Sequence, residues 1–128
     1  MNVMIVSDGA GDFYFLQRFL EELGAQVIYS PSLDEDKVIT RKIDAVVHAW
    51  SGFLSDVERV QIQNILETSP PPVVALFAQP QDVNALRRTF PGQLVAEMKA
   101  LEEPYARRTA EALMREVQKR RGTAAMKA

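Results

Sequence analysis

The sequence predicts a doubly wound α/β fold, in which five parallel strands form one sheet with helices on both faces. Five short apolar runs alternate with five helix-like segments along 128 residues, and this alternation is typical of successive βα units. Three of the runs are continuously apolar, as expected for parallel strands that are covered on both faces. Right-handed crossovers then place every strand-to-helix loop at one edge of the sheet.

The predicted strands differ in character along the chain. The second is short and suits a place near the edge of the sheet. Glu97 interrupts the fifth, so either that strand ends early or a carboxylate reaches its mouth. The five runs are Val3–Val6, Val27–Tyr29, Ala45–Ala49, Val73–Ala78 and Leu94–Met98.

The first two predicted helices lie on either side of the second strand. Asp12 is placed to cap the first, apolar residues recur at helical spacing from Phe15 to Leu23, and Gly24 supplies a C-terminal stop. A shorter helix is expected around Leu33–Arg41.

Three more helices are predicted after the third strand. The third is predicted near Ser55–Glu67, with Ser55 as its cap, before the prolines 70–72 break it. Its expected apolar positions are Val57, Val60, Ile62, Ile65 and Leu66. Asp82 is expected to cap the fourth helix, which ends by Pro91. The fifth begins near Pro104, a favoured first-turn residue, and runs to about Arg121. We therefore expect one domain over residues 1–121, with 122–128 as a flexible tail or the start of a linker.

Composition excludes several classes of protein. Hydrophobic residues make up 47% and charged residues 25%, and the net charge is −2, so no overall positive field favours nucleic acid or an anionic membrane. The absence of cysteine excludes disulfides and thiol chemistry and fits a reducing cytoplasm. No apolar run approaches the length of a membrane span. A cytoplasmic location is expected.

The order and spacing of three segments resemble the receiver domain of bacterial response regulators, over roughly residues 1–121. Val3–Gly9 leads into a helix that ends at Leu23 and Gly24, Asp44–Ala49 forms the third strand, and Pro72–Ala78 the fourth. The resemblance implies a flavodoxin-like (βα)5 fold with strand order 2-1-3-4-5.

In receivers, two acids and an acceptor aspartate hold Mg²⁺, while a hydroxyl and a lysine hold the phosphoryl oxygens. The corresponding positions here are Ser7, Asp8, Ala49, Phe77 and Lys99, and a two-residue shift would put Glu97 in place of Lys99. A methyl group cannot accept a phosphoryl group, one carboxylate makes a poor Mg²⁺ site, and a phenyl ring would fill the phosphoryl space. We expect no metal, no cofactor and no aspartyl phosphorylation.

Several residues near these positions allow two readings. His48, the single histidine, suits a structural role in a buried strand better than a ligand role. Lys99 is read either as an anion ligand or as an ion-pair partner of Asp8 or Glu97. The glycines around Ala10 form either a tight turn or a phosphate cradle. Trp50 either anchors an interface or plugs an edge of the core.

The resemblance implies a non-catalytic signalling module of a bacterial regulatory system. We find no nucleophile with a base partner, so no enzyme is expected. The family's output face is built from the fourth helix, the fifth strand and the fifth helix, which would place it here at Asp82, Arg87, Arg88, Tyr105 and Arg108. A protein partner, an output domain or a second copy of the chain, through the last helix, would bind there. The basic last helix is read as a solvated face rather than a nucleic-acid site. Two alternatives remain open: a working receiver with a displaced acceptor, and a flavodoxin-like binder of a small ligand or nucleotide.

Overall fold

The computed structural model describes residues 1–7, 11–50 and 56–127, with side chains up to Arg121. Within these ranges the chain forms a five-stranded parallel sheet in the order β2-β1-β3-β4-β5. The strands are β1 (Asn2–Val6), β2 (Gln26–Ser30), β3 (Ala45–Ala49), β4 (Val73–Ala78) and β5 (Leu94–Glu97). The predicted fold class and strand order are confirmed.

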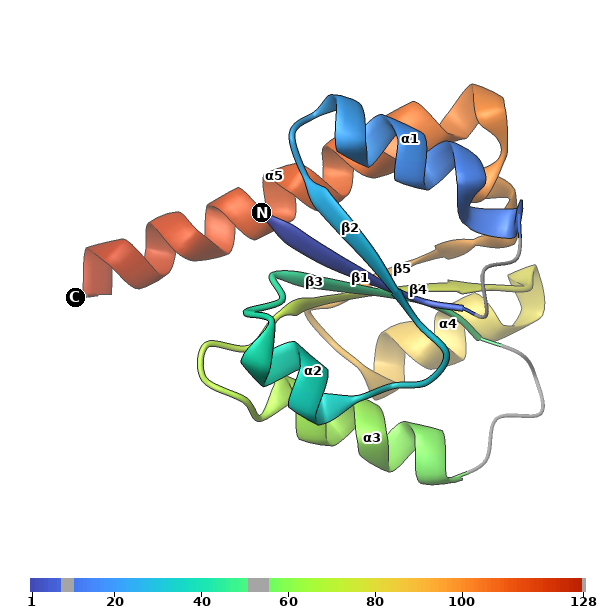
Figure 1. The fold of residues 1–128 in the computed structure, drawn as a ribbon. Helices are drawn as coiled ribbons and strands as arrows, with labels where there is room; N and C mark the ends of the chain where they lie inside the picture. Colours follow the sequence, from blue (N-terminus) through green and yellow to red (C-terminus); the bar gives the residue numbers. More distant parts are fainter. Residues whose placement is uncertain (8–10, 51–55, 128) are drawn as a thin grey trace.

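Helices cover both faces of this sheet. In Figure 1, α1 and α5 lie on one face, and α2, α3 and α4 lie on the other. The helices are α1 (Tyr14–Glu22), α2 (Glu35–Thr40), α3 (Asp56–Leu66), α4 (Pro80–Thr89) and α5 (Glu103–Lys127), with short 3-10 turns η1 (Gly11–Phe13) and η2 (Met98–Leu101). The two groups of helices cover both faces of the sheet, as the continuously apolar strands predicted.

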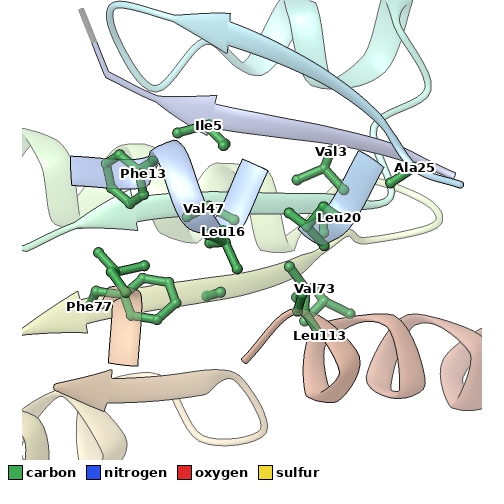
Figure 2. Packing of buried hydrophobic residues seen from close by; sticks show 14 of the residues in the cluster. Val3, Ile5, Phe13, Leu16, Leu20, Ala25, Val47, Val73, Phe77 and Leu113 are labelled. Carbon is green, nitrogen blue, oxygen red and sulfur yellow. The ribbon is translucent and has the colours of Figure 1, made fainter. Parts of the chain in front are cut away.

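The core is divided into two apolar layers by the alternation of side chains along the strands. Ile5 and Val47 face α1 and α5, where they pack in one cluster with Leu16 and Leu113 (Figure 2). The intervening residues, Val46 among them, face α2, α3 and α4 in a second cluster. The sheet therefore separates its two helical layers, and a strand residue contributes to one layer or the other.

Two predicted helix caps are wrong. Asp12 lies inside the 3-10 turn η1 that leads into α1, and Phe13 takes the cap position without a side-chain hydrogen bond. Helix α4 begins at Pro80, with Gln79 as its cap, so Asp82 lies within the first turn. Pro80 suits that first position because its missing N–H has no partner there in any helix.

Helix α3 buries a narrower stripe than predicted. Ile62 and Ile65 are fully buried, whereas Val57 and Val60 are 62% and 56% exposed. Ile62 and Ile65 are three residues apart and share one side of the helix, and this side alone meets the sheet. Ser55, the predicted cap, lies outside the described residues.

Two helices end in left-handed residues. Gly24 has a φ of 94° after α1, and Lys42 has a φ of 51° after α2. The next N–H in each case bonds back to a carbonyl in the last turn, Ala25 to Leu20 and Ile43 to Val38, both at 3.0 Å. This is the Schellman arrangement, which favours glycine at the left-handed position. Gly24 satisfies that preference and Lys42 does not.

The last strand and helix differ from prediction at their ends. β5 ends at Glu97, one residue before the predicted end, and the chain then enters η2. α5 continues through Gly122 to Lys127, past the predicted end near Arg121. One glycine inside a helix costs about 1 kcal/mol, so it need not stop the helix. In Figure 1 the red end of α5 extends beyond the rest of the molecule. Among the described residues, no helix combines the length and the apolarity that a bilayer crossing requires.

Candidate functional site

The carboxyl edge of the sheet brings together three of the five predicted site positions. Ala49 pairs with Phe77 across β3 and β4, and Val6 pairs with His48 across β1 and β3. Ser7 follows Val6 and therefore lies level with Ala49. Backbone bonds fix these strand ends, since Ser7 N–H donates to Ser30 at 2.8 Å and Trp50 N–H donates to Phe77 at 2.7 Å.

Phe77 is part of the core. Its side chain is 2% exposed and belongs to the cluster beneath α1 and α5. Figure 2 shows the ring in this layer, with Phe13, Ile5 and Val47 as further members. Ala49 packs partly buried against the same cluster. A methyl group and a phenyl ring thus stand opposite each other at the ends of β3 and β4.

Lys99 lies past the end of its strand. It is in η2, two residues beyond Glu97, and its ammonium stands 5.5 Å from the centre of the Tyr105 ring. Glu97 is the last residue of β5 and pairs with Ala78. Among the described residues, no ion pair joins Lys99 to Glu97. The described contact of Lys99 is a cation–π interaction.

Asp8 lies outside the described residues, as do Gly9, Ala10 and Phe53. The pairing of Asp8 with Lys99, and the phosphate cradle at the glycines, are therefore predictions that stand as they were. Among the residues that the structure does describe, no group of three or more His, Cys, Asp or Glu side chains is placed to hold a metal ion.

The predicted output face is only partly assembled into one surface. A hollow of about 520 Å³ opens between α4, the end of β5 and the start of α5, and its lining includes Arg87, Glu97, Lys99 and Tyr105. Arg87 also donates to the carbonyl of Val95 at 3.2 Å, on the outer strand of the sheet. This hollow holds two cations, one carboxylate and an aromatic ring that is 41% exposed.

The other three residues of the predicted face do not line this hollow. Arg108 lines a smaller apolar cavity of about 220 Å³ between α5 and strands β4 and β5. Asp82 and Arg88 are on α4 but do not line the larger hollow. The spacing of residues along α4 and α5 could not separate these positions, because it carries no information on how the two helices are rotated against β5.

His48 makes a contact that the sequence did not reveal. Its side chain points to the face opposite Ala49, and Nε2 lies 3.1 Å from a carboxylate oxygen of Glu58 on α3. Nδ1 is buried and has no hydrogen-bond partner among the described residues. Burial lowers the pKa of His48, and the hydrogen bond and charge of Glu58 oppose that shift. No sequence signal links Glu58 to His48, because their contact depends on how α3 packs against the sheet.

Trp50 plugs an edge of the core. Its ring meets Phe90 edge to face at 6.3 Å between centroids, and it packs against the layer under α2, α3 and α4. Ala49 and Phe77 face the opposite layer. Of the two readings of Trp50, the structure supports the core plug.

Solved structures of other proteins share the fold of this chain. A response regulator from Thermotoga maritima is 21% identical, with a TM-score of 0.65, over 88% of this chain and 95% of that one. A response regulator protein from Burkholderia multivorans is 14% identical, with a TM-score of 0.53, over 75% and 82%. A fusion that carries a trimeric coiled coil from yeast is 16% identical, with a TM-score of 0.62, over 99% and 83%. The likeness is one of fold.

At the level of sequence, no protein-family model and no curated protein matches the chain. The similarity to response regulators therefore rests on the arrangement of the sheet and helices.

Proposed function

We infer that this chain is a non-catalytic signalling module that acts by protein contact and does not undergo aspartyl phosphorylation. The observation that carries the inference is the pairing of Ala49 with Phe77 at the mouth of the sheet. In the receiver arrangement this is where the acceptor carboxylate and the phosphoryl-binding hydroxyl stand. Neither a methyl nor a phenyl group can accept a phosphoryl group or bind its oxygens.

Burial of Phe77 supports the same conclusion. A phosphoryl group carries concentrated charge and needs cations and donors close to it. The space beside Ala49 is instead bordered by the cluster that holds Phe77 and Phe13, both almost fully buried. A charged group placed there would lose its hydration without gaining partners, which is strongly unfavourable.

The partner surface that we propose is the hollow between α4, β5 and α5. Tyr105 and Lys99 form an exposed aromatic–cation pair there, and Arg87 and Glu97 add one charge of each sign. Exposed tyrosine and arginine are residues that interfaces use as anchors. A protein partner, an output domain or a second copy of the chain would bind at this surface.

A phosphorylation assay tests the first part of the proposal. The protein is incubated with Mg²⁺ and acetyl phosphate, and its intact mass is recorded beside that of a receiver of known activity. We expect no mass increase of one phosphoryl group. Incorporation that disappears in Asp8→Ala would show a working receiver with a displaced acceptor, and the proposal would fail.

An interaction assay tests the second part. Partners cross-linked to the protein in its own cells are compared for the wild type, Tyr105→Ala and Tyr14→Ala. Tyr14 is 55% exposed on α1 and serves as the matched control. We expect Tyr105→Ala alone to lose the cross-links. If both variants recover the same amount of cross-linked partner, this hollow is excluded as the contact surface.

A further inference from the structure

A second hollow lies at the edge of the sheet opposite the candidate site. It has a volume of about 500 Å³ and opens where β3 and β4 begin, against residues 116–121 of α5. Strands in a parallel sheet all start at one edge, so this hollow and the Ala49–Phe77 pair lie at opposite ends of the same strands. Nothing in the proposed function involves it.

The lining of this hollow is largely apolar. Its side chains come from three separate parts of the chain: Ile43 and Val73 at the starts of two strands, Pro70 and Pro71 from the connection before β4, and Val117 from α5. Prolines cannot shift to fill such a space as flexible side chains do. Its volume falls in the range of ordinary small-molecule sites, which are largely apolar with a few polar groups that orient the ligand.

The rim of the hollow is charged and basic on balance. Three basic residues, Lys119, Arg120 and Arg121, face two acidic residues, Asp44 and Glu116. Arg120 is held by Glu116 at 3.3 Å and by the carbonyl of Gly92. Among the side chains that line the hollow, basic residues outnumber acidic ones by three to two, which favours an anion over a cation as the ligand.

Arg121 is the rim residue best placed to take an anion. It is 55% exposed and contacts one oxygen of Asp44, and a guanidinium has five N–H donors in a planar fork. Asp44 accepts a second hydrogen bond, from the backbone N–H of Asn2 at 2.8 Å. If Arg121 turned to an incoming anion, Asp44 would keep the Asn2 bond, so the exchange would not leave a carboxylate without a partner.

We propose that this hollow binds a small organic anion, with an apolar ring or chain against the apolar lining residues and a carboxylate or sulfonate on Arg121. The anion takes the place of Asp44 at the guanidinium, where a bidentate pair forms. A peptide or a nucleic acid is a poorer fit, because a hollow of about 500 Å³ has the size of a small-molecule site. The ligand binds beside residues 116–121 of α5, and Arg121, which holds it, is the last residue of that helix whose side chain is described.

A pair of probes that differ in one charge tests this site. Anilinonaphthalene sulfonate is an apolar anion, and phenylnaphthylamine is the same ring system without the sulfonate. Fluorescence titrations of the full chain with both probes are compared for the wild type, Arg121→Gln and Arg115→Gln. Arg115 is exposed on the same helix but does not line the hollow, so it controls for the general effect of losing one positive charge.

We expect Arg121→Gln to lower the affinity for the anionic probe about tenfold, because this is the usual effect of losing one charge-assisted hydrogen bond. Binding of the neutral probe should not change, and Arg115→Gln should affect neither. Asp44→Asn should raise the affinity for the anionic probe, because the substitution removes the carboxylate that competes for Arg121. A purely structural role for Arg121 would not give opposite effects for the two substitutions.

Amide chemical shifts locate the probe. With the anionic probe bound, we expect the largest changes at Ile43, Val73 and Val117. The proposal is overturned if the shifts gather around Tyr105, if the two arginine variants weaken binding equally, or if sedimentation shows that a second copy of the chain occupies the hollow and excludes the probe.

Discussion

Phe77 occupies a position where its size matters more than its chemistry. Its ring is 2% exposed and fills the layer between the sheet and helices α1 and α5 (Figure 2). A buried phenylalanine of this kind contributes through the apolar area it removes from water and through close packing. The ring that we propose to exclude a phosphoryl group therefore also stabilises the fold.

Substitution of Phe77 by threonine, the residue that a receiver would have here, should destabilise the protein. We expect the free energy of unfolding to fall by about 3 kcal/mol, since the change leaves a cavity and buries a hydroxyl. Urea denaturation measures the effect. Tyr14→Thr, at an exposed aromatic residue, should change stability by less than about 0.5 kcal/mol. Similar losses in both variants would contradict this assignment of Phe77 to the core.

His48 gives the fold a dependence on pH of known sign. Burial lowers its pKa below the ordinary value of 6.5, so between these two values the unfolded chain binds a proton that the folded chain does not. Stability is therefore full above pH 6.5 and falls as the pH drops from there through the lowered pKa. Glu58 opposes the shift and limits this loss.

The single histidine makes this prediction directly measurable. Its proton resonance, followed by NMR from pH 8 downward, should titrate below 6.5, and lower still in Glu58→Gln. In denaturation experiments at successive pH values, His48→Gln should lose the extra destabilisation below pH 6.5 that the wild type shows. A measured pKa of His48 at or above 6.5 would contradict the predicted loss of stability below pH 6.5.

At the scale of elements, α1 and α2 end in the same backbone conformation but have different residues at the left-handed position. Gly24 and Lys42 both have positive φ, and the same backward hydrogen bonds close the last turns of α1 and α2. Glycine adopts this conformation without strain, whereas a lysine is strained there because its Cβ comes close to its own backbone. α2 therefore ends less favourably than α1.

Exchanging the residues at these two ends should move stability in opposite directions. Lys42→Gly should raise the free energy of unfolding by roughly 0.5–1 kcal/mol, and Gly24→Ala should lower it by about 1 kcal/mol. A Cβ at Gly24 would meet nothing within 4 Å, so the cost there comes from the backbone alone. Thermal and urea denaturation of both variants check the signs. Destabilisation by Lys42→Gly would show that the lysine side chain supports the structure in another way.

At the scale of the whole molecule, the sheet and its order followed from the sequence, while the ends of elements and the side-chain partners did not. Continuous apolar runs identified β3 and β4 with correct bounds because buried parallel strands need apolar residues on both faces. The two wrong caps arose because Asp12 and Asp82 are good cap residues in general, but 3-10 and proline starts displaced the helices by a few residues.

For the candidate site, the sequence predicted which strand ends meet but not which side chains contact one another. Strand register brings Ser7, Ala49 and Phe77 to one edge, and register follows from the apolar pattern. The contacts of Lys99 with Tyr105 and of His48 with Glu58 depend on how η2, α3 and α5 are oriented. Those orientations depend on packing, which spacing along the chain does not encode.

The extent of the folded unit is a further prediction at this scale. We propose that it ends near Arg121, since Val117 is the last described buried residue and Arg121 the last described residue in an ion pair. Deletion of residues 122–128 should change the free energy of unfolding by less than about 0.5 kcal/mol. Deletion of residues 113–128, which removes Leu113 and Val117 from the core, should abolish cooperative unfolding. Circular dichroism during urea denaturation distinguishes the outcomes.

The opposition of Ala49 and Phe77 also constrains how this protein can change over evolutionary time. An aspartate introduced at residue 49 alone would stand beside a buried ring that gives it no partner. A hydroxyl introduced at residue 77 alone would open a cavity with nothing to bind. Each single substitution should therefore lower the free energy of unfolding. Placing a carboxylate at residue 49 and a hydroxyl at residue 77 one at a time would require a less stable intermediate.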